Sequence, residues 1–241
     1  MTILAVIPAR YASTRFPGKP LVDVQGKPMI QRVYENVIKS DLFTEVVVAT
    51  DDERIVKVAE SFGANVVLTS KEHESGTDRC GEVIQLLQNE FDIVVNIQGD
   101  EPMVNPLQLK ELVDVFKNPQ AQIATLKSFI TNEEDIANPN VVKVVTSNDG
   151  KALYFSRITI PYNRNNTVVP YFKHIGLYAY TSDTLKKITQ LSLGELEKFE
   201  SLEQLRWLEN GYNIYVAESN FKNIGIDTPE DLIELNKHYK F

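Results

Sequence analysis

Residues 3–20 read ILAVIPARYASTRFPGKP, an apolar run followed directly by a cationic loop, and this stretch decides the fold. The apolar run, Ile3 to Ala9, is typical of a strand buried on both faces of a parallel sheet. The runs at 45–50 and 92–97 repeat the pattern. Segments with helical spacing lie between these runs, so the sequence predicts an α/β fold whose parallel sheet is wound by right-handed crossovers.

Turn and capping residues divide the rest of the chain. Helices are predicted after Pro28, from Asp52 to a stop at Gly63, and after Gly76. The second half is less regular, and its expected elements are a hairpin of 141–146 with 152–155, strands at 175–180 and 213–217, and helices at 182–189, at 198–209 and from Pro229. We expect one sheet-based domain over residues 1–241, with a smaller lobe within about 130–190.

Composition excludes several classes of protein. The 241 residues include 43% hydrophobic and 24% charged side chains, which is typical of a globular chain. A net charge of −8 disfavours nucleic acid as a partner, because affinity for the phosphate backbone comes from clustered positive charge. No apolar run approaches the roughly 20 residues that span a bilayer, so no membrane insertion is expected. The single cysteine, Cys80, excludes an intramolecular disulfide and favours a reducing compartment, so we expect the cytoplasm.

The charge is uneven along the chain. Between Pro8 and Pro28 there are four cationic side chains and one acidic one, a local charge of +3 in an acidic protein. No G-x-G-x-x-G motif occurs, and Lys19 is followed by Pro20, so the loop is neither a Rossmann fingerprint nor a Walker A loop. The loop follows the first strand, where open α/β sheets bind ligands, so it is a candidate phosphate site, although a solvated surface patch explains the charges equally well.

Two aspartates follow other predicted strands. Asp100 stands in the segment 96–102, where an apolar strand ends in an amide, a glycine and two acids, and Asp227 precedes the last predicted helix. Each could be a helix cap, and for Asp227 capping is the commoner explanation. Together with the cationic loop, however, they could clamp a metal-bound triphosphate from opposite sides.

The chain closely resembles the 3-deoxy-manno-octulosonate (Kdo) cytidylyltransferases, the CMP-Kdo synthetases of Gram-negative bacteria. The matching segments, in order along the chain, are residues 7–21, 48–51, 75–79, 96–102, 152–157, 174–178, 202–206 and 227–231. The related N-acylneuraminate cytidylyltransferases typically carry Asn after the loop lysine. This chain has Pro20 there, which favours the Kdo branch.

This resemblance implies a nucleotide-diphospho-sugar transferase-like, Rossmann-like fold, usually as a homodimer, and transfer of CMP from CTP to Kdo with Mg²⁺. It implies that Arg10, Arg15 and Lys19 hold the triphosphate, and that Asp100 and Asp227 bind the metal, Lys19 and both aspartates being the catalytic set. The cytosine and ribose would be lined by Pro8, Ala9, Ser75, Thr77 and Arg79. The sugar acid would be held by Gln98, Arg157, His174, Tyr178, Glu203 and Gln204.

Two departures from the family pattern lie in the part of the chain that the resemblance assigns to sugar binding. Many members carry Arg after the tyrosine-rich strand, where this chain has Thr181, and the loop 162–172 is shorter than usual. Alternative substrates are therefore 8-amino-Kdo and sialic acid. A non-catalytic nucleotide-binding module is a further alternative, but it would require damage to the nucleotide site, whose predicted residues are all present. Activated Kdo would serve lipopolysaccharide synthesis.

Overall fold

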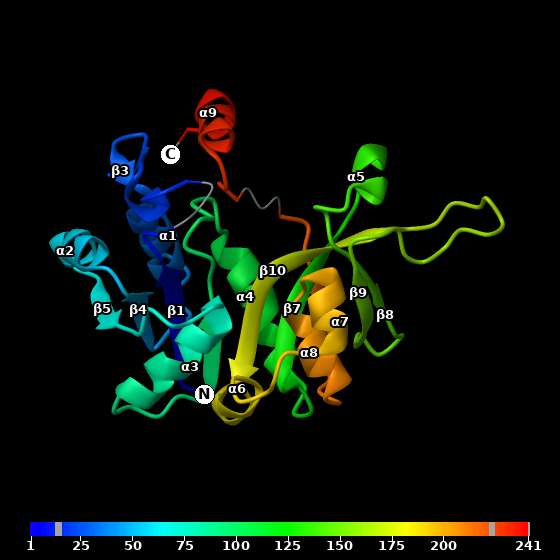
Figure 1. Cartoon of the computed structure of the whole chain (residues 1–241), viewed down its shortest axis with the longest axis horizontal. Helices are drawn as coiled ribbons and strands as arrows, with labels where there is room; N and C mark the ends of the chain where they lie inside the picture. Colours follow the sequence, from blue (N-terminus) through cyan, green and yellow to red (C-terminus); the bar gives the residue numbers. More distant parts are fainter. Residues whose placement is uncertain (13–15, 222–224, 241) are drawn as a thin grey trace. The chain divides into compact units, whose positions relative to one another are not determined.

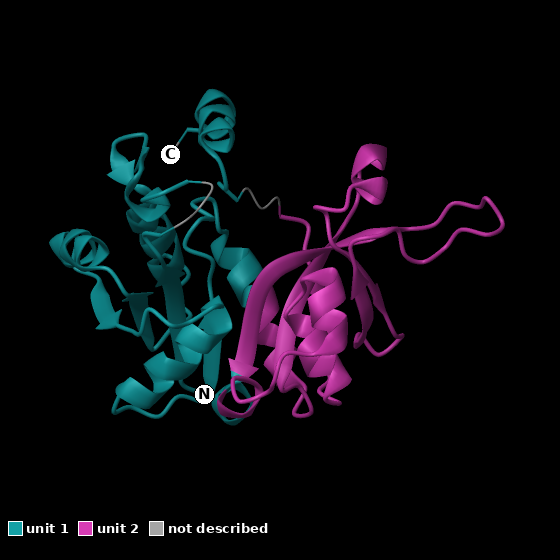
Figure 2. Ribbon diagram, viewed as in Figure 1, with its two compact units in different colours: residues 1–110, 181–185, 222–241 teal, residues 111–180, 186–221 magenta. Residues whose placement is uncertain are grey.

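The computed structural model describes residues 1–12, 16–221 and 225–240. The chain divides into two compact units, coloured separately in Figure 2. Unit 1 comprises residues 1–110, 181–185 and 222–241, and unit 2 comprises residues 111–180 and 186–221. The predicted lobe within about 130–190 and its role in dimerisation stay predictions.

The core of unit 1 is a parallel sheet in the strand order β6-β1-β4-β5 (Figure 1). The bounds of its strands are β1 (Ile3–Ala9), β4 (Glu45–Thr50), β5 (Asn65–Leu68) and β6 (Ile93–Asn96). The side chains of β1 are buried along almost its whole length, because helices cover both faces of a parallel sheet. The predicted parallel sheet is confirmed here, and the predicted strands 3–9 and 45–50 have the observed bounds.

Helices connect these strands as crossovers. The principal ones are α1 (Met29–Ile38), α2 (Glu53–Ser61) and α3 (Gly76–Leu86). Asp52 caps α2 by accepting a hydrogen bond from the Arg54 amide at 2.9 Å, and Gly63, at φ +83°, follows its end as predicted. The chain steps outward from β1 to β5 and then returns to β6, so right-handed crossovers place α3 on the face opposite α1 and α2.

Short elements and the C-terminal helix complete unit 1. They are a 3₁₀ turn at Lys19–Leu21, the ribbon β2 (Asp23–Val24) with β3 (Lys27–Pro28), the first turns of α4 (Pro106–Asp114) and of α6 (Ser182–Ile188), and α9 (Pro229–His238). Pro229 stands at the first position of α9, as predicted, and the cap is Thr228, which accepts a hydrogen bond from the Asp231 amide. Ile226 and Leu235 pack with Val24 and Met29 in one buried cluster, which anchors the C-terminal segment to unit 1.

Unit 2 is built on a mixed sheet in the order β11-β7-β10, with the hairpin β8-β9 attached to β10 (Figure 1). Its elements are a 3₁₀ turn at Val115–Lys117, β7 (Ile123–Phe129), α5 (Glu133–Ala137), β8 (Lys143–Thr146), β9 (Ala152–Ser156), β10 (Phe172–Thr181), α7 (Glu195–Glu200), α8 (Gln204–Glu209) and β11 (Ile214–Glu218). The predicted hairpin is confirmed. The predicted single helix over 198–209 is wrong, because Ser201 adopts φ +52° and breaks it into α7 and α8.

Candidate functional site

A cavity of about 430 Å³ lies in unit 1, beyond the carboxyl ends of β1 and β6. Open α/β sheets bind ligands at this edge. The cavity is lined by Pro8, Ala9, Arg10, Ala12, Lys19, Pro20, Ser75, Gly76, Arg79, Gln98, Gly99, Asp100 and Asp227. The structure therefore brings together nine of the predicted site residues from five separate segments. Of the other predicted nucleotide residues, Thr77 is buried on α3 outside the lining, and Arg15 lies outside the described residues.

The ammonium group of Lys19 stands between the two aspartates. Its Nζ lies 2.6 Å from Asp100 Oδ2 and 3.1 Å from Asp227 Oδ1. The Lys19 side chain is only 12% exposed, so these contacts are partly shielded from water and stronger than a surface ion pair. Asp100 and Asp227 are 81 and 208 positions from Lys19 in the sequence, and both contact its ammonium group. Capping does not explain the aspartates, because Thr228 caps α9 and the helix after Asp100 begins only at Pro106.

Backbone contacts explain why the two aspartates meet. The amide of Ile226 donates a 3.0 Å hydrogen bond to the carbonyl of Asp100, which ties the two loops together. Gly99 lies so close to β1 that a Cβ there would approach the Pro8 carbonyl oxygen to 2.6 Å. Only glycine allows this approach without displacement. Gly99 belongs to the segment 96–102, but the sequence alone predicted no role for it.

The two carboxylates can also hold a divalent ion. Carboxylate oxygens suit Mg²⁺, which keeps several waters and uses one or two protein carboxylates together with substrate phosphates. Both aspartates already converge on one positive charge, the Lys19 ammonium, so the local geometry accommodates a cation. Within the described part of the chain, no group of three or more His, Cys, Asp or Glu residues forms a metal cage. A metal here would therefore need further oxygen ligands from substrate or water.

Arg79 is the second cation of the cavity with unusual surroundings. It is fully buried on α3, donates to Thr69 and Ser70, and lies 3.6 Å from a carboxylate oxygen of Asp51. Its Nε and Nη2 atoms have no hydrogen-bond partner among the described residues. Burial, with a smaller contribution from the neighbouring cation Arg10, lowers the pKa of Arg79. A buried guanidinium with free donors facing a cavity favours a polar or anionic ligand.

The N-terminus of α3 and Arg10 add further donors. Ser75 caps α3 by accepting from the Asp78 amide at 3.0 Å, and Ser75 and Gly76 both line the cavity. The first amides of a helix attract anions. Arg10 is exposed and makes no hydrogen bond or ion pair to a residue that the structure describes. Three cations against two aspartates leave the lining with a formal charge of +1.

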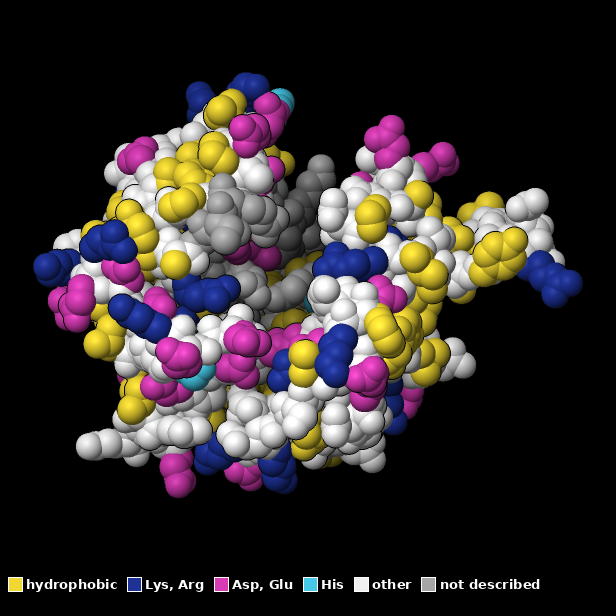
Figure 3. All heavy atoms as spheres, viewed as in Figure 1, with side chains coloured by type: hydrophobic (Ala, Val, Ile, Leu, Met, Phe, Trp, Pro, Cys, Tyr) yellow, Lys and Arg dark blue, Asp and Glu magenta, His cyan; other side chains and the backbone are white. Residues whose placement is uncertain are grey.

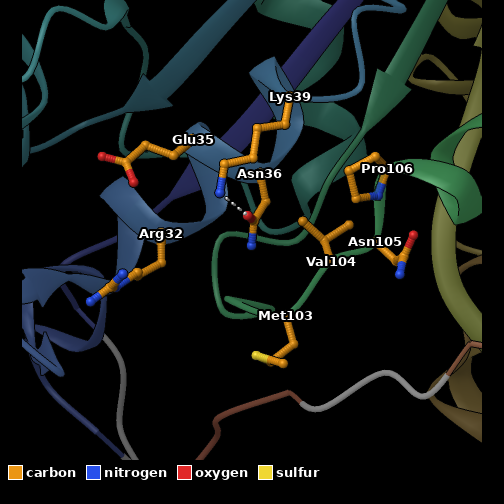
Figure 4. Close-up of a pocket in the computed structure, with 8 residues that line it drawn as sticks. All are labelled: Arg32, Glu35, Asn36, Lys39, Met103, Val104, Asn105 and Pro106. Atoms are coloured by element: carbon orange, nitrogen blue, oxygen red, sulfur yellow. Dashed lines mark hydrogen bonds between the residues drawn. The ribbon is translucent and has the colours of Figure 1, made fainter. Parts of the chain in front are cut away.

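A second cavity of about 290 Å³ lies between α1 and the segment 103–106 (Figure 4). Its lining residues are Arg32, Glu35, Asn36, Lys39, Met103, Val104, Asn105 and Pro106. Asn36 on α1 donates from Nδ2 to the Pro102 carbonyl at 2.8 Å and accepts from Lys39 Nζ at 3.2 Å. Asn36 therefore fastens the end of the loop that carries Asp100, and none of the predicted site residues lies here.

In unit 2, β10 carries His174 and Tyr178 into an aromatic cluster. The ring of His174 lies 5.0 Å from that of Phe155 and 5.3 Å from that of Tyr178. Trp207 on α8 packs edge-on against Tyr178 at 5.1 Å. Burial lowers the pKa of His174 to about 3, so its ring is neutral near pH 7. Burial, and then the negative charge of Glu203, raise the pKa of Tyr178 well above its ordinary value.

Unpaired polar atoms mark this cluster as a candidate ligand site within unit 2. The Gln204 Nε2 is buried and has no hydrogen-bond partner in the described chain, and the buried Tyr178 hydroxyl has only a weak contact with the Thr125 hydroxyl. Buried polar groups are normally paired, so such atoms indicate a missing ligand or water. The predicted sugar residues His174, Tyr178, Glu203 and Gln204 thus come from β10 and from the start of α8. Gln98, the remaining amide of the predicted sugar set, belongs to unit 1.

Arg157 has a different environment from the one predicted. Its guanidinium donates to the backbone carbonyls of Pro139, Glu200 and Ser201. Two of these carbonyls end α7, so Arg157 caps that helix and supports the corner leading to Glu203. Its role in binding a sugar carboxylate stays a prediction.

A partly buried hydrogen-bond network surrounds Arg157. Lys143 is fully buried, and its Nζ donates to the carbonyls of Asn138, Val141 and Arg157 at 2.6–2.8 Å. Glu200 accepts from the Ser156 hydroxyl at 2.7 Å and from the Arg157 amide at 2.9 Å. Neither residue was predicted, because a lysine in a strand gives no signal of burial and a glutamate on a charged helix gives no signal of its hydrogen bonds.

Comparisons with known proteins identify the class. A family model described as cytidylyltransferase matches residues 4–220. A solved structure of CMP:2-keto-3-deoxy-manno-octonic acid synthetase complexed with CTP is 44% identical, with a TM-score of 0.93 and 98% of each chain covered. A 4-diphosphocytidyl-2C-methyl-D-erythritol synthase from Anaerococcus prevotii, at 16% identity and a TM-score of 0.65, shares the fold. The predicted nucleotide-diphospho-sugar transferase-like fold is thereby confirmed.

Curated relatives narrow the class to one family. The 3-deoxy-manno-octulosonate cytidylyltransferase of Cytophaga hutchinsonii is 51% identical, covering 98% of this chain and 96% of that protein. The same enzyme from Bacteroides thetaiotaomicron is 52% identical, covering 96% of each chain. The chain belongs to the 3-deoxy-manno-octulosonate cytidylyltransferase family, as the resemblance predicted. No helix among the described residues is long and apolar enough to cross a membrane.

Proposed function

We propose that this protein transfers CMP from CTP to the anomeric hydroxyl of Kdo and releases diphosphate. The observation that carries the proposal is the convergence of Asp100 and Asp227 on the Lys19 ammonium inside a cationic cavity. In the reaction, the anomeric oxygen forms a bond to the α-phosphorus, the bond from that phosphorus to the bridging oxygen breaks, and diphosphate leaves. The hydroxyl proton passes to water. Catalysis of this kind depends mainly on positioning and charge neutralisation.

Nucleotide binding would use the residues that line the larger cavity of unit 1. Arg10 and Lys19 would contact the triphosphate, because both are cations that line the cavity and follow the carboxyl end of β1 in the sequence. Arg79, whose Nε has no hydrogen-bond partner in the described chain, would donate to the cytidine, beside the α3 amides at Ser75. Asp100 and Asp227 would hold Mg²⁺. When bound, this ion would neutralise charge on the α-phosphate and acidify the attacking hydroxyl. Lys19 would then exchange its carboxylate partners for phosphate oxygens.

Binding of the sugar acid would use the polar atoms of β10 and α8 in unit 2. Kdo is an acid with several hydroxyls, so its pocket needs both donors and acceptors. The Tyr178 hydroxyl and the Gln204 amide are free to donate, whereas the neutral His174 and the carboxylate of Glu203 can accept. Such a site rejects analogues that lack a hydroxyl, because buried polar groups are then left unpaired.

We propose that the protein works as a cytoplasmic homodimer in lipopolysaccharide synthesis. The exposed apolar side chains of the loop between β9 and β10 support the proposal of a dimer. Ile158 is 70%, Tyr162 86% and Val168 100% exposed, and Figure 3 shows hydrophobic side chains gathered on this loop. Exposed apolar patches commonly mark protein interfaces. Elsewhere on the visible face, acidic and basic side chains are interspersed (Figure 3). Light scattering during gel filtration should give twice the mass of 27.3 kDa, and V168D should shift it toward one chain.

One assay tests the function and its alternatives. Purified protein is incubated with CTP and Mg²⁺ and with Kdo, 8-amino-Kdo or sialic acid, and diphosphate release is followed. Kdo should give the highest kcat/KM. Preference for 8-amino-Kdo or sialic acid would reassign the substrate, whereas CTP binding without turnover of any of the three would favour a binding module. Omission of Mg²⁺, with chelator present, should stop the reaction.

A further inference from the structure

The hydroxyl of Thr125 occupies an irregularity in the sheet of unit 2. Thr125 lies on β7 and is fully buried. The register between β7 and β10 shifts between Ile175 and Tyr178, which is a β-bulge. Thr125 Oγ1 lies 2.8 Å from the Leu177 carbonyl oxygen and 3.1 Å from that of Ile175. The same oxygen lies 3.0 Å from Nε2 of His174, and the Tyr178 hydroxyl is a further, weaker neighbour that can use its second lone pair.

Proton accounting decides which atom is the donor in each contact. A threonine hydroxyl has one hydrogen and two lone pairs. If that hydrogen pointed to His174, both carbonyl oxygens would face lone pairs of the hydroxyl at 2.8 and 3.1 Å with no hydrogen between them. That arrangement is repulsive, so the hydrogen goes to a carbonyl. The Thr125 oxygen must then accept, and the hydrogen in its contact with His174 belongs to Nε2.

The other ring nitrogen is thereby fixed as an acceptor. A neutral imidazole carries one hydrogen, so a hydrogen on Nε2 leaves a lone pair on Nδ1. Burial holds the pKa of His174 at about 3, which keeps the ring neutral. Phe155 and Tyr178 pack against the ring and limit its rotation. In the described chain, Nδ1 has no hydrogen-bond partner, although His174 itself remains partly exposed.

We propose that Thr125 is a positioning residue that locks His174 in its Nε2-protonated form, so that Nδ1 accepts a hydrogen bond from a hydroxyl of the sugar acid. This inference rests on the proposed function, because it takes the sugar acid as the ligand of His174. The proposal also predicts which chemical group of a ligand His174 accepts. A hydroxyl can donate to Nδ1, whereas a carboxylate or a carbonyl placed there would set two acceptors against each other.

Nitrogen NMR of the ring tests the lock directly, without any substrate. The chain has only three histidines, so the ¹⁵N-histidine-labelled protein gives three ring systems. H174N identifies the resonances of His174 by their loss. At neutral pH, Nε2 should show the shift of a protonated nitrogen and Nδ1 that of a nitrogen with a lone pair. The reverse assignment would overturn the proposal, whether or not the enzyme turns over Kdo.

Substitutions at Thr125 test the consequence for binding. T125V keeps the shape but removes the hydroxyl, T125S keeps the hydroxyl, and S128A removes a different hydroxyl from the same strand. With T125V we expect a mixture of ring tautomers and a KM for the sugar acid raised about 3- to 10-fold, the effect of one hydrogen bond. The KM for CTP should not change. T125S and S128A should show the wild-type tautomer and a KM within about twofold of wild type.

The paired readouts separate positioning from a structural effect. A higher KM for the sugar without a change of tautomer would assign Thr125 a packing role and overturn the proposal. A change of tautomer without a change in that KM would do the same, because the acceptor would then not contact substrate. If T125V does not fold, the wild-type and T125S spectra still decide the tautomer. Failure of wild-type protein to use Kdo would refute the proposed function and leave the tautomer result standing.

Discussion

Replacement of Gly99 by alanine tests whether the loop geometry, and not only the carboxylates, sets activity. The added Cβ would lie 2.6 Å from the Pro8 carbonyl oxygen, whereas ordinary contacts begin at 3.4 Å, so the loop must move by about 0.8 Å. Pro8 lies in the central strand β1, so the loop rather than the strand has to yield. The shift would carry Asp100 away from Lys19 and Asp227. A misplacement near 1 Å costs about 100-fold in rate, and overpacking costs about 1–3 kcal/mol of stability.

The assay is diphosphate release with CTP, Kdo and Mg²⁺, together with urea unfolding. For G99A we expect kcat/KM about 100-fold below wild type, with a folded protein at the assay temperature. G225A is the matched control, because a Cβ on Gly225 meets nothing within 4 Å although this residue lies in the loop of Asp227. It should stay within about 0.5 kcal/mol of wild type. Wild-type kcat/KM for G99A would refute the reasoning that this close approach positions Asp100.

Three further predictions concern charged or titratable groups. K19M should lower kcat/KM for CTP about 10- to 100-fold, which is the effect of losing one charge-assisted contact. Calorimetry should show tighter Mn²⁺ binding to the nucleotide-free K19M protein, because no ammonium group then competes for the two carboxylates. An unchanged affinity for Mn²⁺ would contradict this prediction. Because the pKa of His174 is about 3 when folded and near 6.5 when unfolded, the free energy of unfolding should fall as pH drops from 6.5 toward 3, and urea titrations of H174N should show a shallower decline. K143M should lose about 3 kcal/mol in urea unfolding, because three partly buried carbonyls lose their donor. A loss under about 0.5 kcal/mol would argue against that network.

The fold of unit 1 was largely readable from the sequence because its signals are local. Uninterrupted apolar runs marked β1 and β4, Gly63 marked the end of one helix, and Pro229 marked the start of another. Unit 2 was less readable. The strand β7 was not predicted, and the break at Ser201 was missed, because a non-glycine residue with positive φ has no reliable signature.

The candidate site likewise combines residues that local sequence signals predicted with tertiary contacts that they did not. Motif residues such as Asp100 and Asp227 were found by their position after strands. Their mutual approach depends on the Ile226 amide and on Gly99, which are tertiary contacts that spacing alone does not reveal. Thr125 was invisible in the sequence, because its importance comes from a bulge in the opposite strand.

The central claim is that Asp100 and Asp227 act as one unit around a shared cation. A double-mutant cycle of D100N, D227N and the double variant tests this directly, with kcat/KM for CTP measured over a range of Mg²⁺ concentrations. If the aspartates share one ion, either single substitution should remove most of the activity, and the double variant should be little worse than each single one. Losses that simply add, or a single variant with near wild-type activity and Mg²⁺ dependence, would contradict the claim.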